Sequence, residues 1–192
     1  HITTGEGGMI LTNDETLADN CRELRNLCFR PDDRFVHYKL GWNFRMTNLQ
    51  AAVGVAQLEQ IENFIKKKRW IGNKYNELLR DVKEINLPFT ETKYANNIYW
   101  GYGVILNKYI SCEAKEVMAS LKKHGIGCRP FFYPMHEQPI FKKLGLFTNE
   151  SYPVSEKLYK KGFYLPSGLA LTEEQILIVS NKLKKVLNEL ND

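Results

Sequence analysis

An asparagine and an arginine two positions apart are the side chains of this sequence best suited to holding an anion. Asn43 and Arg45 lie in residues 41–60, where a loop rich in aromatic and amide side chains leads into a helix. Thr47 and Gln50 have the spacing of a capping box, which satisfies the first free backbone N–H groups of a helix and fixes where it begins. A guanidinium and an amide placed just before that start suit a phosphate. The alternative is an ordinary helix-entry turn.

A second group of polar and aromatic side chains occupies residues 129–141, RPFFYPMHEQPIF. Its three prolines fix φ and withhold hydrogen-bond donors, so the segment is predicted to be a shaped surface loop, not a regular helix or a central strand. Loops of this kind often carry function.

Long helical patterns must position these two groups. Apolar residues return to one face at 3.6 residues per turn through segment 47–82, which predicts one long amphipathic helix. Asn13 or Asp14 is expected to cap a helix ending at Asn26. A capping box at Thr172 predicts a last helix, whose buried side comprises Ile176, Val179, Leu183, Val186, Leu187 and Leu190.

Strand patterns are shorter. A glycine-rich turn at residues 5–8 is followed by a predicted strand at 9–12. Alternating residues predict a strand at 98–106. Ser111 is expected to cap a helix at 111–124, and a second strand is predicted at 127–132. Residues 152–164 are predicted as a helix that is interrupted toward Gly162. This order fits a small α/β domain.

The composition indicates a folded protein of one or two domains, with 192 residues, 43% hydrophobic residues and a formal charge of +5. No apolar run reaches the roughly 18 residues of a membrane span. Lysine-rich stretches such as 66–69 are predicted to be solvated helix faces, without nucleic-acid contact. The four cysteines (Cys21, Cys28, Cys112 and Cys128) lack a Cys-x-x-Cys pair, which favours reduced thiols in a cytoplasmic protein over disulfides or a metal site.

Four stretches, in this order, carry a resemblance to a known family: ITTGEGGMILTND, GWNFRMTNLQAAVGVAQLEQIENFIKKKR, RPFFYPMHEQPIF and LPSGLALTEEQI. Together they resemble the second half of the sugar aminotransferases that use pyridoxal phosphate, the DegT/DnrJ/EryC1/StrS family. The resemblance implies an α/β fold, the C-terminal half of an aspartate-aminotransferase-like (fold type I) enzyme. Residues 1–46 would end the large cofactor-binding domain, 47–82 would form the connecting helix, and 83–192 the small C-terminal α/β domain.

The resemblance also implies an activity. Within the family, Trp100 and the RPFFYPMH stretch are most similar to perosamine-synthase-like enzymes. Such enzymes take an amine, usually from glutamate, store it on the cofactor as pyridoxamine phosphate and transfer it to carbon 4 of a nucleotide-linked 4-keto-6-deoxy sugar. The expected role is the biosynthesis of surface polysaccharide such as lipopolysaccharide O-antigen.

Several site residues follow from the same resemblance. Asn43 and Arg45 would come from the neighbouring subunit, with Asn43 reaching the cofactor phosphate, so a homodimer with a shared active site is expected. His136 would lie near the substrate, with further contacts from Tyr133, Arg129 and Trp100. The alternative is a hydrogen-bonded loop histidine and a packing tyrosine. The family's Schiff-base lysine directly precedes the position of His1, so no catalytic residue is expected in this chain, which would be part of a longer polypeptide.

Two other functions remain open. One is a sugar 3-dehydratase of the same family, although those enzymes tend toward a lysine and an aspartate where this chain has Arg45 and Asn48. The other is a non-enzymatic interaction module made of the small domain alone, which would be a monomer without bound pyridoxal phosphate.

Overall fold

The computed structural model describes residues 1–190 and divides the chain into two compact units, His1–Asn63 and Phe64–Asp192. The boundary falls inside the segment 47–82 that the sequence assigns to a connecting helix. The three-part division at residues 46 and 82 stays a prediction. No helix within residues 1–190 combines the length and the apolar character needed to cross a membrane.

Segment 47–82 forms two helices, α2 (Asn48–Leu58) and α3 (Ile61–Leu79), so the prediction of one continuous helix was wrong. The capping box is confirmed, because Thr47 Oγ1 accepts from the Gln50 N–H at 3.2 Å and Gln50 Oε1 accepts from the Thr47 N–H at 2.9 Å. The break has a local cause. The Gln60 N–H bonds to the Gln57 carbonyl, three residues back, which tightens and ends the last turn of α2.

The first unit also contains α1 (Glu15–Arg25), which is capped by Asp14 as predicted. Asp14 Oδ1 accepts from the Leu17 N–H at 3.0 Å. The predicted strand at 9–12 is wrong: residues 9–12 form no strand, and Leu11 is 87% exposed. Within residues 1–63, Cys28 is the only fully buried hydrophobic side chain. This unit therefore presents most of its apolar surface to solvent.

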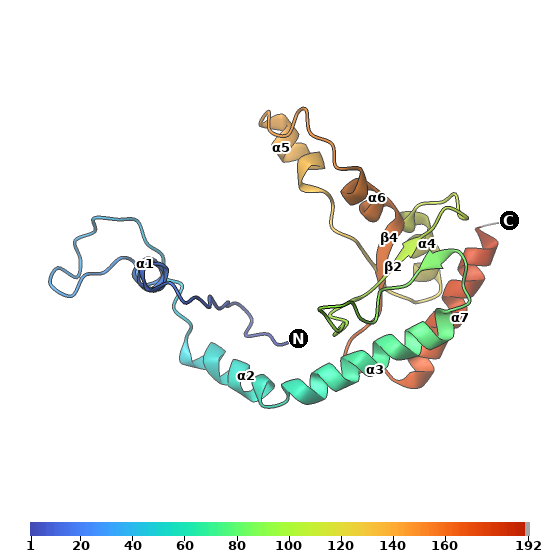
Figure 1. Ribbon diagram of the computed structural model, residues 1–192, viewed down its shortest axis with the longest axis horizontal. Helices are drawn as coiled ribbons and strands as arrows, with labels where there is room; N and C mark the ends of the chain where they lie inside the picture. Colours follow the sequence, from blue (N-terminus) through green and yellow to red (C-terminus); the bar gives the residue numbers. More distant parts are fainter. Residues whose placement is uncertain (191–192) are drawn as a thin grey trace. The chain divides into compact units, whose positions relative to one another are not determined.

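A four-stranded antiparallel sheet with the strand order β1-β2-β4-β3 forms the centre of the second unit (Figure 1). The strands are β1 (Ile85–Asn86), β2 (Tyr102–Leu106), β3 (Arg129–Pro130) and β4 (Gly162–Leu165). The predicted strands at 98–106 and 127–132 are confirmed only in part, because each starts later or is shorter. The prediction of a helix at 152–164 interrupted toward Gly162 is confirmed in part, because α6 (Pro153–Lys161) ends there, but residues 162–165 form β4.

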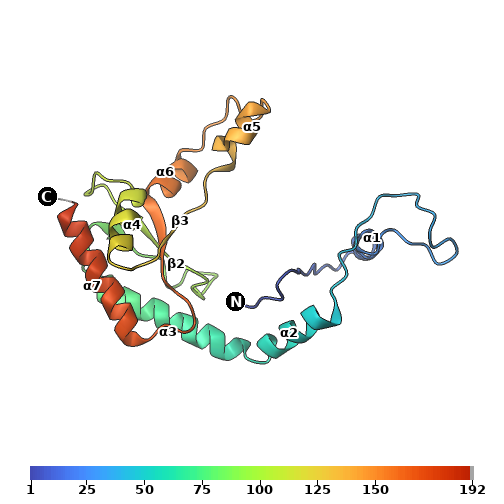
Figure 2. The same ribbon diagram turned by 180° about the vertical axis from the view of Figure 1, so that it is seen from behind.

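The core lies on one face of this sheet. Alternate residues of β2 and β4 point into it: Tyr102, Val104, Leu106, Phe163 and Leu165 are at most 2% exposed. They pack in one hydrophobic cluster with α3, α4 (Ala114–Lys123) and α7 (Glu173–Glu189), and Figure 2 shows the helices around the sheet. The predicted core side of α7 is confirmed, with five residues buried and Leu190 half-buried. The cap of α4 is Glu113, not the predicted Ser111.

The segment between β3 and α6 leaves the sheet and returns to it. It contains a short 3-10 helix, η1 (Met135–Glu137), and α5 (Pro139–Lys143), which stands away from the sheet in both views (Figures 1 and 2). The prediction of an irregular segment is thus confirmed in part. The prediction that it lies wholly at the surface is wrong, because Pro134 and His136 are buried.

Candidate functional site

The loop that carries Asn43 and Arg45 is held in place by its backbone. The N–H groups of Trp42 and Phe44 donate to carbonyls of the last turn of α1, at 2.8 and 3.0 Å. On its other side the loop runs into the capping box of α2. Local hydrogen bonds therefore fix both ends of the loop at residues 42–46, independently of the Asn43 and Arg45 side chains between them.

The two side chains lie together. Arg45 Nε donates to Asn43 Oδ1 at 3.1 Å, so the guanidinium orients the amide. This contact uses the amide oxygen and leaves the amide N–H groups and the terminal guanidinium N–H groups without a protein acceptor among residues 1–190. Both residues are exposed. The remaining donor set consists of N–H groups and one positive charge, which fits the phosphate of a cofactor.

An aromatic layer, composed of Trp100, Phe131 and Tyr164, covers the outer face of the sheet in the second unit. The Tyr164 ring lies 4.6 Å from the Phe131 ring and 6.3 Å from the Trp100 indole, measured between centroids. Arg129 is the direct cross-strand partner of Tyr164, so both side chains stand on this face. Trp100 is 64% exposed and Arg129 is also exposed.

The aromatic layer packs directly against three glycines, where a side chain would collide with its rings. A Cβ atom at Gly103 or Gly162 would lie 2.9 or 2.4 Å from the Phe131 ring, and one at Gly101 would lie 3.0 Å from Tyr164. The rings can therefore rest on the backbone of β2 and β4 only because these positions lack side chains. Phe131 lies in the predicted functional loop 129–141 but was not predicted as a site residue, and nothing in the sequence indicated Tyr164 directly. The one available signal was the glycine pair at 101 and 103 beside a predicted strand.

Tyr133 contacts α6 and not the aromatic layer. Its ring meets Tyr159 of α6 edge-on at 4.7 Å, and the side chain is 38% exposed. The structure thus brings Trp100 and Arg129 to one face of the sheet, while Tyr133 packs on α6.

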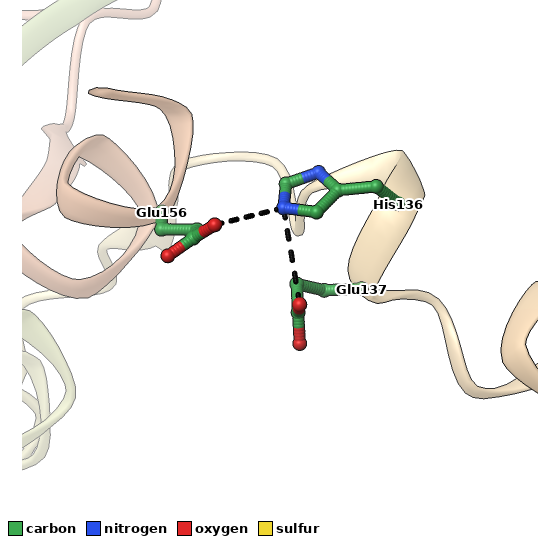
Figure 3. A group of neighbouring side chains, drawn as sticks. All are labelled: His136, Glu137 and Glu156. Atoms are coloured by element: carbon green, nitrogen blue, oxygen red, sulfur yellow. Dashed lines mark hydrogen bonds and ion pairs between the residues drawn. The ribbon is translucent and has the colours of Figure 1, made fainter. Parts of the chain in front are cut away.

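His136 is buried, with 5% of its surface exposed, and its ring is engaged by acidic residues (Figure 3). Nε2 lies 3.0 Å from Glu156 Oε1 and 3.8 Å from Glu137 Oε1. Glu156 also accepts from the Tyr152 N–H at 3.0 Å, at the start of α6. This is the geometry expected for a hydrogen-bonded loop histidine. A role for His136 in contacting the substrate stays a prediction.

The same three side chains have ligand types that metals use. One ligand atom from each of His136, Glu137 and Glu156 lies within 4.8 Å of the others. Each carboxylate nevertheless has a protein partner, since Glu137 pairs with Lys142 at 2.6 Å and Glu156 accepts from Tyr152. We assign this cluster to holding the segment before α6 in place, because its groups are satisfied by one another.

This cluster should make the free energy of unfolding depend on pH in the acid range. The hydrogen bond from His136, followed by that from the Tyr152 N–H, lowers the pKa of Glu156. A carboxyl whose pKa is lowered by folding contributes stability above its ordinary value of 4.5, and the contribution is lost as the pH falls through the lowered pKa. Glu156→Gln should remove this pH-dependent part of the free energy of unfolding, which is measured by urea denaturation at several pH values between about 6 and 3. Glu174→Gln, near the start of α7, is the matched control. Equal acid dependence in the parent and in Glu156→Gln would contradict the assignment.

The profile of the DegT/DnrJ/EryC1/StrS aminotransferase family matches residues 1–184. The chain belongs to this family. Among the family's curated relatives, a GDP-perosamine synthase of Vibrio cholerae is 35% identical over 190 residues, covering 97% of this chain and 50% of the relative. A GDP-perosamine synthase of Caulobacter vibrioides is 36% identical over 187 residues, covering 97% and 49%. The chain spans about half the length of the family members that it matches.

Solved structures of aminotransferases share the fold. The aminotransferase TlmJ of Streptoalloteichus hindustanus superposes with a TM-score of 0.86 at 22% identity, covering 98% of this chain and 50% of that one. Helicobacter pylori PseC, an aminotransferase involved in the biosynthesis of pseudoaminic acid, gives 0.83 at 21% identity, covering 93% and 48%. The expected fold class, α/β with part of a fold type I enzyme, is confirmed by these matches.

Proposed function

We propose that this chain is part of a pyridoxal phosphate-dependent aminotransferase that converts a nucleotide-linked 4-keto-6-deoxy sugar into the 4-amino sugar, with glutamate as donor. The observation that carries the proposal is the fixed donor pair Asn43–Arg45 in a chain whose family profile match runs from residue 1 to 184. The name of the relatives, GDP-perosamine synthase, supports the sugar class. The product would enter surface polysaccharide, and the enzyme would work in the cytoplasm.

The cofactor would be held by its phosphate. Asn43 and Arg45 offer amide and guanidinium N–H groups from a loop that is pinned by backbone bonds on both sides. Pyridoxal phosphate, when bound, supplies the electron sink for moving an amino group. The protein's contribution from this chain is placement, because a phosphate gripped at one point orients the ring attached to it. The lysine that binds the cofactor covalently would be provided outside this chain, just before His1.

The proposed working form is a homodimer with a shared site. The sequence of α2 carries no charged residue, and its apolar side chains Leu49, Val53, Val55 and Leu58 are 48–81% exposed. A helix that is apolar around much of its circumference is usually buried in the functional assembly. The first unit has a single buried hydrophobic residue, and surface of this kind marks contact with other protein, which includes the rest of the large domain as well as a second subunit.

The sugar nucleotide would use the outer face of the sheet in the second unit. Arg129 can pair with diphosphate oxygens, and the exposed Trp100 indole can lie against the apolar C–H face of a sugar ring. Tyr133 and His136 are proposed as further contacts. His136 would have to exchange its bond to Glu156 for one to the substrate, which makes it the less direct of the two.

The test is a nucleotide-sugar screen of the intact enzyme with pyridoxal phosphate and glutamate. The expected result is amination of a 4-keto-6-deoxy sugar. Apart from the keto acid that glutamate itself forms, no simple keto acid should accept the amino group. Loss of the sugar's C3 hydroxyl without nitrogen incorporation would identify the 3-dehydratase reaction. A monomer that takes up no pyridoxal phosphate would identify a non-enzymatic module. Either outcome contradicts the proposal.

A further inference from the structure

Tyr99 has a backbone conformation that bulky residues rarely adopt. Its φ is 48°, in the left-handed region, and its side chain is only 2% exposed. A left-handed bulky residue persists where its surroundings force it, and such positions concentrate at functional sites. The residue that follows it is Trp100, which is 64% exposed.

Several contacts hold Tyr99 in this conformation. Its N–H donates to Asn97 Oδ1 at 2.7 Å, and its hydroxyl oxygen accepts from Asn76 Nδ2 at 3.0 Å. The ring lies over Gly72 of α3, where a Cβ atom would come within 2.5 Å of the ring carbons. The loop residue Asn97 therefore fixes the backbone, while α3 fixes both the hydroxyl, through Asn76, and the ring, at Gly72.

Lys68 fixes the backbone on the other side of this turn. Its ammonium donates to the Trp100 carbonyl at 3.0 Å and to the Ser167 carbonyl at 2.7 Å. The side chain is 9% exposed, and burial lowers the pKa of Lys68. The prediction that residues 66–69 are a solvated face was therefore wrong at this position. Burying an ammonium is costly unless it is hydrogen-bonded, and here its bonds go to carbonyls.

The two carbonyls belong to loops at the same end of the sheet. Tyr102 of β2 pairs with Leu165 of β4, so the residues before β2 and after β4 lie side by side. Lys68 therefore ties the Trp100 turn to the 166–168 loop. Tyr75, two turns further along α3, adds a second tie by donating its hydroxyl to the Pro166 carbonyl at 2.8 Å.

We propose that Lys68 and Tyr99 are positioning residues that hold the exposed Trp100 indole, just before the start of β2, for the apolar face of the substrate's sugar ring. Among residues 1–190, the indole has one aromatic neighbour, Tyr164, which it meets edge-on at 6.3 Å. Its place is set mainly by its backbone. The sugar part of this proposal rests on the proposed function, whereas the positioning part can be measured without activity.

The positioning part is tested by fluorescence. The chain has three tryptophans, so Trp42→Phe with Trp70→Phe leaves Trp100 as the only emitter. In that background, Lys68→Met should raise the acrylamide quenching constant of Trp100, because the carbonyl tie is lost and the remaining buried part of the indole becomes accessible. Lys66→Met, an exposed lysine on the same helix, should leave it unchanged. If Lys68→Met does not fold, Tyr99→Phe removes only the hydroxyl contacts and should shift quenching in the same direction.

The sugar part is tested by kinetics of the intact enzyme. Lys68→Met should raise KM for the nucleotide sugar about tenfold, with kcat within about twofold and cofactor affinity unchanged. Lys68→Arg, which keeps a positive charge, should raise KM less than Lys68→Met does. A folded Lys68→Met enzyme with unchanged quenching overturns the positioning role. Increased quenching with an unchanged KM overturns the sugar contact alone. Increased quenching in an enzyme that aminates no sugar supports positioning and refutes the proposed function.

Discussion

Gly162→Ala should lower the free energy of unfolding by about 2–3 kcal/mol, because the added methyl group has no space. Its Cβ would lie 2.4 Å from Phe131 Cδ2 and 2.6 Å from the Leu158 carbonyl oxygen. That oxygen accepts the Gly162 N–H at the end of α6, so it cannot retreat without loosening the helix end. Urea denaturation followed by circular dichroism measures the effect.

Gly127→Ala is the matched control for this prediction. No heavy atom lies within 4 Å of its ideal Cβ position, so the change should stay within about 0.5 kcal/mol. Phe131→Ala should partly rescue Gly162→Ala, because it removes one of the two collisions. Equal stability of Gly162→Ala and the parent would show that the aromatic layer does not rest on the β4 backbone as described.

Asn43→Ala should weaken retention of pyridoxal phosphate by the intact enzyme about tenfold or more. A hydrogen bond to a charged group contributes about 1.5–3 kcal/mol, and each 1.4 kcal/mol is about tenfold in affinity. Arg45→Ala should weaken it at least as much, since it removes a charge and also the contact that orients Asn43. Equilibrium dialysis against the cofactor measures both.

The control for the cofactor prediction is Asn20→Ala, an exposed asparagine on α1 in the same unit. The backbone bonds of Trp42 and Phe44 remain in Asn43→Ala, so the loop should keep its conformation. Unchanged affinity in a folded Asn43→Ala enzyme would remove this residue from the cofactor site.

Local patterns in the sequence predicted much of the helical structure. The caps at Asp14, Thr47 and Thr172 are formed by neighbouring side chains and backbone, so their spacing alone is sufficient. The buried side of α7 follows from the 3.6-residue repeat in the same way. The contact between Asn43 and Arg45 joins residues two positions apart, which is why the pair could be identified before the fold was known.

The features that the sequence did not predict depend on distant partners. The strand β4 has four residues and follows α6 directly. Gly162 indicates an interruption of the helix, but only the pairing with β2 makes the next residues a strand. Lys68 is buried because two carbonyls about 30 and 100 positions away meet its ammonium. The aromatic layer needs β2, β3 and β4 in register, so neither Phe131 nor Tyr164 could be placed from spacing alone.

The most direct measurement of the central claim follows nitrogen from glutamate into the sugar. The intact enzyme is given pyridoxal phosphate, glutamate labelled with heavy nitrogen, and a nucleotide-linked 4-keto-6-deoxy sugar, and the product is analysed by mass spectrometry and NMR. We expect the label on carbon 4 of the sugar. A product without the label, from an enzyme that is folded and retains its cofactor, would contradict it.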